Sequence, residues 1–196
     1  VAIETDGEGD AILMLHGLGG SSNTWTPQMG SLTREKVIRF DLPGSARSSR
    51  AEGELSIQRF VDCARRVMDL AGASRAHVVG HSLGTIVALH LAASEPSAVR
   101  SLCLFGPLLA PPDTARDNIR ARGQKARDEG VSGMQAIADA VQQATTSSET
   151  KQRRLTAVAY VRESLMRQDP ESYARTCDAL AAAQPADTTK IDCPTL

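Results

Sequence analysis

The sequence lacks any apolar run of the roughly 18 residues that a membrane-spanning helix needs. Its first residues also lack the charged segment and apolar core of a signal peptide. The four cysteines are too scattered for a secreted disulfide scaffold or for a zinc site, whose ligands come in close pairs. We therefore expect a cytoplasmic protein that makes no membrane contact and binds no metal. Its cysteines are expected to be buried thiols: Cys63, Cys103, Cys177 and Cys193.

An excess of charge of either sign is also missing, since 22 lysines and arginines face 23 aspartates and glutamates. Nothing in this balance attracts nucleic acid or an anionic membrane surface. A chain of 196 residues can bury a sizeable core as one domain, alone or with an inserted subdomain. The expected partner is a small molecule, and the sequence does not set the oligomeric state.

Short apolar runs of strand length alternate with helical patterns along the first two thirds of the chain. This alternation is typical of an α/β fold with a mostly parallel sheet flanked by helices. The predicted strands are Ile12 to Leu15, Val37 to Phe40, Ala76 to Val79 and Ser101 to Phe105. Ser56 is the predicted N-cap of a helix that Gly72 ends. A second helix, Leu83 to Ala93, is apolar nearly all round and should be buried.

The pattern changes after Gly106-Pro107, because residues 113–183 contain amphipathic helical patterns and no convincing strand. Asp169-Pro170 is the predicted start of one of these helices. We expect three segments: a sheet-containing core at 1–106, an inserted helical cap over the functional site at 107–188, and the start of a returning core strand at 189–196. A separate helical domain is the alternative, which the lack of a flexible linker disfavours.

A glycine-flanked serine, Gly80-His81-Ser82-Leu83-Gly84, lies between a predicted strand and the predicted buried helix. The pattern alone arises easily by chance, so its context carries the inference. A serine at a sharp strand-to-helix turn sits in strained backbone, and the flanking glycines let neighbouring chain approach without a Cβ. The helix N-terminus favours negative charge developing there. Ser82 is therefore the predicted nucleophile; the alternative is a serine that only caps the helix.

A glycine-rich segment, His16-Gly17-Leu18-Gly19-Gly20, follows the first predicted strand. Acyl transfer needs backbone N–H donors aimed at the tetrahedral oxyanion. Such a loop can supply one donor, and the residue after the nucleophile can supply another. We expect the N–H groups of Leu18 and Leu83 in this role. A phosphate-binding loop is the alternative, but the glycine spacing fits neither common phosphate-binding pattern.

His16-Gly17, Trp25 with Pro27-Gln28, Asp41-x-x-Gly44 and Gly80-His81-Ser82-x-Gly84 occur in the order and spacing of the α/β-hydrolase superfamily, which the chain resembles over essentially its whole length. The Trp25 segment, the helical block and the stretch from Tyr173 to Leu196 are similar to 3-oxoadipate enol-lactonases and their esterase relatives. The resemblance implies serine-dependent hydrolysis of a carboxylic ester or lactone through an acyl-enzyme, without metal or organic cofactor. The alternatives are a C–C bond hydrolase or perhydrolase on the same machinery, or a non-catalytic small-molecule-binding homologue.

The resemblance also implies that an acid and then a histidine base follow the serine along the chain. After Ser82 the sequence contains only His90, which lies two turns into the next helix, so its ring cannot return to the serine hydroxyl. The other three histidines precede the serine, and none is a credible base. Asp113 is the alternative acid. We therefore expect the acid, the base and the last strands of the sheet beyond Leu196.

Two residues are candidates for the substrate pocket. Trp25 either lines it or anchors the segment after the glycine-rich loop. His81 lies in the serine turn, where it either lines the pocket or packs locally. Ser45-Ala46 stands where many relatives carry His-Gly, and we expect this loop to be structural.

Two side-chain groups in the helical block also have two interpretations. An apolar set at helical spacing is interpreted as packing between cap and core, and the alternative is contact with substrate: Met134, Ile137, Ala138 and Val141. A basic run is interpreted as a solvated helix face, and the alternative is contact with an anionic substrate at the cap rim: Arg116, Arg120, Arg122, Lys125 and Arg127.

Overall fold

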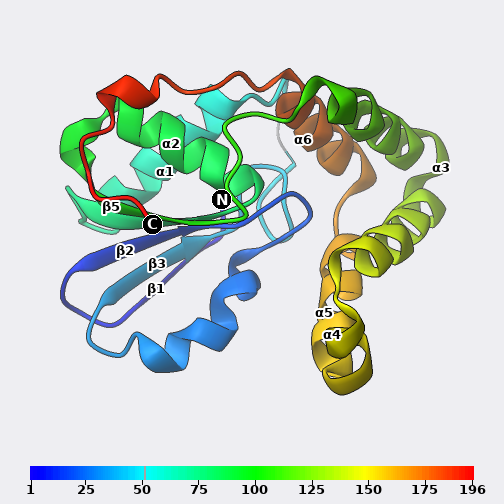
Figure 1. Ribbon diagram of the computed structural model, residues 1–196, viewed down its shortest axis with the longest axis horizontal. Helices are drawn as coiled ribbons and strands as arrows, with labels where there is room; N and C mark the ends of the chain where they lie inside the picture. Colours follow the sequence, from blue (N-terminus) through cyan, green and yellow to red (C-terminus); the bar gives the residue numbers. More distant parts are fainter. Residues whose placement is uncertain (51) are drawn as a thin grey trace.

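A five-stranded sheet with helices on both faces forms the larger part of the computed structural model, which describes residues 1–50 and 52–196 (Figure 1). The strands are β1 (Ile3–Asp6), β2 (Ala11–Leu15), β3 (Lys36–Phe40), β4 (Ala76–His81) and β5 (Val99–Phe105). Their order across the sheet is β1-β3-β2-β4-β5, and only β1 runs antiparallel to its neighbour. The four strands predicted from the sequence are confirmed.

Strand β1 was not predicted, because its four residues lack the continuous apolar run of the other strands. Two of its residues are half-buried and two are exposed, as expected at the edge of a sheet. Strand β2 is the opposite case. All five of its residues are buried, since β2 lies at the centre with Leu13 paired to Ile38 on one side and Val78 on the other.

Helices α1 (Ile57–Leu70) and α2 (Leu83–Ser94) cover one face of the sheet, and the 3-10 helix η1 (Ser22–Ser31) lies on the other (Figure 1). Helix α1 starts at the predicted N-cap, where the Ser56 hydroxyl accepts from the Arg59 N–H (3.2 Å). It buries one apolar face, whereas α2 is buried on nearly all sides between α1 and the sheet. Both predicted helices are confirmed, and α2 is held rigidly at the centre of the core.

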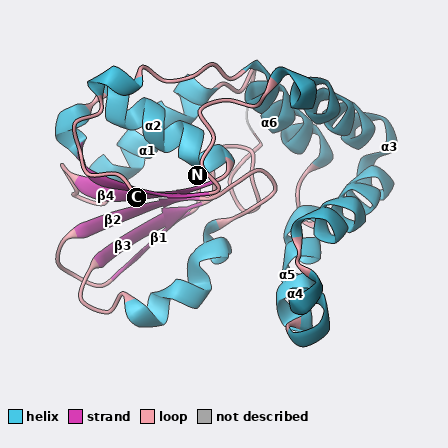
Figure 2. Cartoon of the chain, in the orientation of Figure 1, coloured by secondary structure: helices cyan, strands magenta, loops and turns pink. Residues whose placement is uncertain are grey.

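A block of four helices lies beside one end of the sheet, at the right of Figure 2. No strand interrupts these helices along the chain. It consists of α3 (Asp113–Thr145), α4 (Ser148–Arg153), α5 (Leu155–Met166) and α6 (Pro170–Ala182). Helix α3 bends at Gly130, whose φ of 57° is outside the helical region. The Asp169 side chain caps α6 by accepting from the Ser172 N–H (3.0 Å), as predicted. We call these four helices the helical block.

The helical block has an apolar cluster of its own. Met134, Ile137 and Ala138 are buried in it together with residues of α5 and α6, so these three pack mainly within the helical block and not, as predicted, between cap and core. Val141, the fourth member of the predicted set, instead lines the cavity described below. Within the described residues, no helix has both the length and the apolar character needed to cross a membrane.

The segment after the helical block returns to the sheet next to β5. It contains the 3-10 helix η3 (Thr188–Lys190). Another short 3-10 helix, η2 (Pro96–Ala98), connects α2 to β5. Thr195 forms a parallel bridge with Leu102, whose N–H donates to the Pro194 carbonyl oxygen (2.9 Å). One isolated parallel bridge thus lies in the segment where a returning strand is predicted, and the three predicted segments, with bounds at 106 and 188, remain a prediction. All four cysteines are free thiols, but only Cys177 is buried as predicted, whereas Cys63, Cys103 and Cys193 are half-buried.

Candidate active site

Ser82 lies at the sharp turn between β4 and α2, in a backbone conformation that few non-glycine residues adopt. Its φ and ψ angles are 52° and −116°, and strain of this kind costs on the order of 1–3 kcal/mol, so it persists only where the surroundings impose it. The Ser82 N–H donates to the Phe105 carbonyl oxygen (3.0 Å). The Ser82 carbonyl oxygen accepts from the N–H (2.8 Å) and the hydroxyl (2.6 Å) of Thr85. These three hydrogen bonds hold the serine at the carboxyl end of the sheet.

The two glycines of the turn are required by close backbone packing. A Cβ atom at Gly80 would lie 2.6 Å from the carbonyl oxygen of Gly84. A Cβ atom at Gly84 would overlap the carbonyl oxygen of Leu15, at the end of β2. Neither position therefore accepts a side chain without moving backbone, which agrees with the reason for glycine predicted from the sequence.

A cavity of about 400 Å³ opens beside Ser82, between the carboxyl ends of β2 and β4 and the helical block. The core contributes the glycine-rich loop 17–20 and His81 to its wall. The helical block contributes four aliphatic side chains, together with Arg122, Thr145, Ser164 and two tyrosines. A concave and mostly apolar space with a few polar groups is typical of small-molecule sites.

Side chains of the helical block hold the glycine-rich loop in place. Gln168 is buried, and its Nε2 donates to the carbonyl oxygens of Gly19 (3.2 Å) and Gly20 (3.3 Å). The Ser164 hydroxyl donates to the same Gly19 oxygen (2.8 Å). On its other side, the Gln168 Oε1 accepts from the Ala46 N–H (3.0 Å). One amide therefore connects the helical block to two loops at the carboxyl end of the sheet.

The His16 side chain also holds the glycine-rich loop in place, through its ring nitrogens. Its buried ring lies between the Gly17 carbonyl oxygen, 2.8 Å from Nδ1, and the Leu42 N–H, which donates to Nε2 (2.9 Å). Because Nε2 accepts, Nδ1 carries the proton of the neutral ring and donates to Gly17. Burial lowers the pKa of His16, which keeps the ring neutral. Both ring nitrogens are thus engaged in structural hydrogen bonds.

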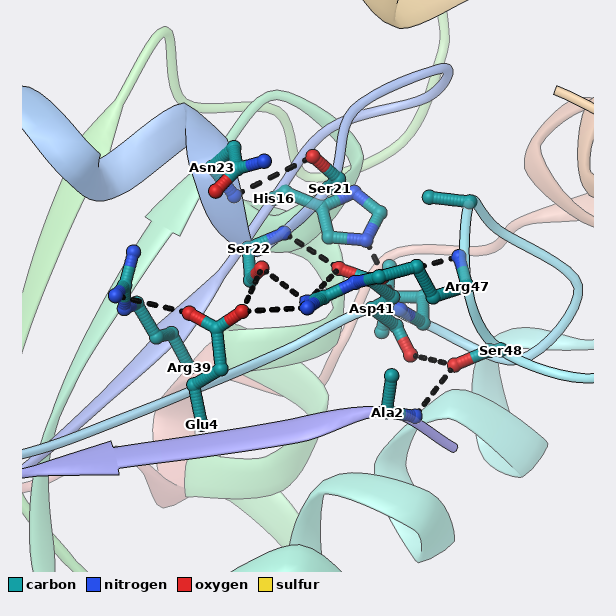
Figure 3. A network of polar contacts seen from close by, with 12 residues as sticks. Ala2, Glu4, His16, Ser21, Ser22, Asn23, Arg39, Asp41, Arg47 and Ser48 are labelled. Carbon is teal, nitrogen blue, oxygen red and sulfur yellow. Dashed lines mark hydrogen bonds and ion pairs between the residues drawn. The ribbon is translucent and has the colours of Figure 1, made fainter. Parts of the chain in front are cut away.

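Buried Asp41 anchors the turn that follows β3 through a polar network that is only partly buried (Figure 3). Its Oδ1 accepts from the Ser22 N–H (2.7 Å), and its Oδ2 accepts from Nε of Arg47 (2.9 Å). Arg47 also pairs with Glu4 of β1 (2.6 Å). Burial alone would raise the pKa of Asp41, but the hydrogen bonds from Arg47 and Ser22 outweigh it and hold the pKa below its usual value. This network supports the structural role expected for the loop.

Three of the predicted site residues come together at the cavity. Leu18 and His81 line it with Ser82. The His81 ring lies close to Gly17, and its partial burial lowers its pKa. Leu83, the first residue of α2, is fully buried, and an α-helix leaves the N–H groups of its first turn without partners in the helix.

Trp25 does not line this cavity. Its buried ring packs with Ile12, Met14 and Val37 on the face of the sheet that η1 covers. Its centroid lies 6.1 Å from that of Phe105. These contacts fit the anchoring interpretation, and no contact in the described part of the chain supports a pocket role for Trp25.

Two further histidines are engaged away from the serine. His77 Nδ1 lies 2.7 Å from the Ser101 hydroxyl on the neighbouring strand, and His90 Nε2 lies 2.9 Å from the Gln184 carbonyl oxygen. Asp113 begins α3 with a side chain that is 98% exposed and pairs with Arg116 (3.1 Å). It does not line the cavity, so it is not placed to act as the acid.

Sequence reasoning missed the side chains that support the site, namely Thr85, Ser164 and Gln168. Thr85 sits inside the apolar helix pattern, where a buried hydroxyl gave no signal. Ser164 and Gln168 reach the loop across more than 140 positions of sequence. A polar residue in an amphipathic helix looks like any solvated residue until the fold shows what it faces.

A family model described as alpha/beta hydrolase fold matches residues 10–182. A curated protein of Azorhizobium caulinodans named "Putative carbamate hydrolase RutD" is 41% identical over 102 residues, which are 52% of this chain and 38% of that protein. The chain therefore spans well under half of the length of this curated relative.

Solved structures match over nearly the whole chain. The enol-lactonase from Burkholderia xenovorans LB400 superposes with a TM-score of 0.90 at 26% identity, covering 98% of this chain and 75% of that one. A thermophilic esterase from Thermogutta terrifontis superposes with a TM-score of 0.91 at 24% identity, covering 99% and 72%.

Proposed function

The chain belongs to the alpha/beta hydrolase fold family, and from this membership we propose that it hydrolyses a carboxylic ester or lactone through an acyl-enzyme on Ser82. The family match confirms the predicted fold class. The observation that carries the proposal is the strained serine turn, fixed by three hydrogen bonds at the wall of a small-molecule-sized cavity. The relatives named as hydrolases and as an enol-lactonase support a hydrolytic reaction.

In the proposed reaction, the Ser82 Oγ forms a bond to the substrate carbonyl carbon while a base takes the hydroxyl proton. The carbonyl electrons move to the oxygen, and the N–H groups of Leu18 and Leu83 donate to this oxyanion. The ester C–O bond then breaks, and the departing alkoxide takes the proton. Water repeats the same steps on the acyl-enzyme and releases the acid. In a lactone, the alcohol formed stays attached to the acyl chain.

The proposal requires a base that the described residues do not bring to Ser82. In this family the acid and then the histidine follow the serine along the chain. We propose that both lie beyond Leu196. The hydrogen bond between Pro194 and β5 supports this, because the chain here already lies beside β5, in the position of the next strand of the sheet.

The helical block, with the connections at 107–188, is proposed to cap the cavity and to select the substrate. Three of its helices contribute to the cavity wall opposite Ser82. No metal or organic cofactor takes part in the proposed reaction, and the expected partner is a small ester or lactone.

The first test replaces the nucleophile. Ser82→Ala should lower the turnover of short 4-nitrophenyl esters and enol-lactones by roughly 10⁴-fold or more, because the acyl-enzyme cannot form. The urea midpoint should stay unchanged, since the substitution keeps a Cβ in the same backbone conformation. The matched control is Ser74→Ala, at an exposed position away from the cavity. Substantial turnover by folded Ser82→Ala protein contradicts the proposal.

The intact mass of the natural protein gives a second, independent test. A mass above the 20.8 kDa of residues 1–196 is expected, because the acid and base must be supplied by further chain. A mass equal to 20.8 kDa would leave Ser82 without a base. Autonomous catalysis would then be abandoned in favour of a small-molecule-binding role for the cavity.

A further inference from the structure

The segment that leads from β5 towards α3 is bonded to the serine turn at two points. The Phe105 carbonyl oxygen accepts from the Ser82 N–H (3.0 Å), and the Leu108 N–H donates to the hydroxyl of Thr85 (3.0 Å). The same hydroxyl donates to the Ser82 carbonyl oxygen (2.6 Å). Ser82 is therefore joined at its N–H directly, and at its carbonyl group through Thr85, to residues 105–108, which lead into the helical block.

The direction of the two Thr85 bonds follows from the atoms that meet there. The Leu108 nitrogen can only donate, so the Thr85 hydroxyl accepts from it and keeps its own single proton for an acceptor. Two carbonyl oxygens are within reach, that of Ser82 at 2.6 Å and that of Leu108 at 3.4 Å. The proton belongs to the shorter contact, with Ser82. Thr85 is fully buried, so its hydroxyl depends on these two partners.

A second buried threonine shows what is particular about Thr85. The Thr176 hydroxyl, in α6, donates to the Ser172 carbonyl oxygen one turn earlier (2.9 Å), a common bond for a threonine in a helix. Among the described residues, it receives no hydrogen bond from another segment. Thr85 makes a similar bond back to the start of α2, but it also accepts from Leu108, 23 positions away. Its hydroxyl therefore bridges two segments of the chain.

Ser82 depends on such support because its backbone is strained. Its φ of 52° and ψ of −116° persist only where the surroundings impose them. The supporting segment is itself held in place, since Pro107 fixes one of its backbone angles and Leu108 packs against the main apolar cluster of the core. A change in the position of this segment is thus passed to Ser82 through both ends of the strained residue.

We infer that Thr85 is a positioning residue for the proposed reaction: its hydroxyl ties the strained Ser82 backbone to the segment that enters the helical block. The inference rests on the proposed function, and it adds a link between the nucleophile and the helical block. Thr85 is fully buried and does not line the cavity, so it is not placed to contact substrate. Its contribution should therefore appear in kcat and not in substrate binding.

The test removes the hydroxyl and keeps the shape of the side chain. Thr85→Val is close in shape to threonine and loses both hydrogen bonds. In the full-length protein, kcat for 4-nitrophenyl acetate should fall roughly 10- to 100-fold, because small displacements of a reacting group cost factors of this size. KM should stay within about threefold of wild type, since ground-state binding is untouched. Thr85→Ser restores the hydroxyl and should bring kcat back to within about threefold of wild type.

Thr176→Val is the matched control, because it removes a buried threonine hydroxyl that bonds only within its own helix. It should leave kcat within about twofold of wild type. Circular dichroism and the urea midpoint show that each variant is folded under the conditions of the assay. If Thr85→Val does not fold, Thr85→Ala takes its place with the same expectation, because it puts no methyl group against the Leu108 N–H.

The outcomes separate this inference from the proposed function. If Thr85→Val is as active as Thr176→Val, or if Thr85→Ser loses as much kcat as Thr85→Val, the positioning role is refuted while the hydrolase stands. A raised KM with unchanged kcat also overturns it. If wild type hydrolyses no ester, the proposed function fails, and hydrogen exchange measured by NMR decides the bridge alone. Faster exchange of the Leu108 N–H in Thr85→Val than in Thr176→Val supports the bridge, and equal rates overturn it.

Discussion

Gly84 sits where the serine turn packs directly on the end of β2. The atom that a Cβ would meet there is a backbone carbonyl oxygen, that of Leu15. Leu15 is itself fixed, because it pairs with Gly80 in the ladder between β2 and β4. Unlike a flexible side chain, this oxygen cannot move aside without disturbing the ladder. The close packing that positions Ser82 therefore depends on the absence of one methyl group.

Gly84→Ala should lower the free energy of unfolding by about 2 kcal/mol or more, in the range seen when a packed core is overfilled. Turnover should fall with it, because the turn that holds Ser82 must shift. Urea unfolding followed by circular dichroism measures the first effect. Gly30→Ala is the control, since nothing lies within 4 Å of a Cβ at that position. Equal effects of the two substitutions would show that backbone contact at Gly84 is unimportant.

At the residue scale, sequence reasoning worked where the determinants are local. The serine turn was predictable because strand, turn and helix lie within a few residues of Ser82. The role of Gln168 was not, because its partner Gly19 is 149 positions away in the sequence. The two interpretations of Trp25 could not be separated for the same reason: its neighbours come from β2 and β3.

The end of α5 and the start of α6 are joined to the core through Gln168. Replacing this residue by leucine leaves the carbonyl oxygens of Gly19 and Gly20 and the Ala46 N–H short of partners in a buried place. Unpaired buried groups cost about 1–3 kcal/mol each, so Gln168→Leu should destabilise the fold by at least that amount. If the loop supplies an oxyanion donor, kcat should fall more than KM rises.

Urea unfolding and steady-state kinetics together check this prediction. Arg167→Ala is the matched control, because Arg167 is the preceding residue, is exposed and pairs only distantly with Glu163 (4.0 Å). It should change stability by no more than about 0.5 kcal/mol. A Gln168→Leu protein as stable and active as the control would show that the loop keeps its shape without the helical block.

At the element scale, strands with continuous apolar runs were predictable and β1 was not. Helix starts marked by Ser56 and Asp169 were also predictable, because N-caps act through local backbone chemistry. Which face of α3 meets the cavity was not, since charged residues recur in every turn of its first half, from Asp113 to Glu129. Only the fold shows that Arg122 lines the cavity, whereas its neighbours Arg120 and Lys125 pair with carboxylates.

Over the whole molecule, two buried groups make the fold sensitive to acid. The folded chain holds His16 neutral with a lowered pKa, whereas the unfolded chain takes up a proton near pH 6.5. Stability therefore falls as pH drops below about 6.5, by up to about 1.4 kcal/mol per pH unit, until the folded pKa is reached. Asp41 acts at lower pH. Its lowered pKa contributes stability that is present above about pH 4 and is lost as pH falls through the folded value.

The free energy of unfolding, measured in urea from pH 7.5 to 3.5, should thus decline in two stages. His16→Gln, which can still accept from Leu42 and donate to Gly17, should flatten the first stage. Asp41→Asn should lower stability at pH 7, and its difference from wild type should begin to shrink below about pH 4 and vanish only below the lowered pKa of Asp41. An unchanged slope between pH 6.5 and 5 in His16→Gln would assign the first stage to other groups.

The returning segment has a geometric consequence at the edge of the sheet. Leu196 accepts from the Leu104 N–H and runs parallel to β5, and the next residue of β5 is Phe105, whose carbonyl oxygen holds the Ser82 N–H. A strand advances about 3.3 Å per residue. Chain that continued from Leu196 in this register would draw level with the Ser82 turn after about two residues. The spacing along β5 therefore predicts where the first loop residue beyond that strand would emerge: level with the Ser82 turn but across β5 from it, on the side away from His16.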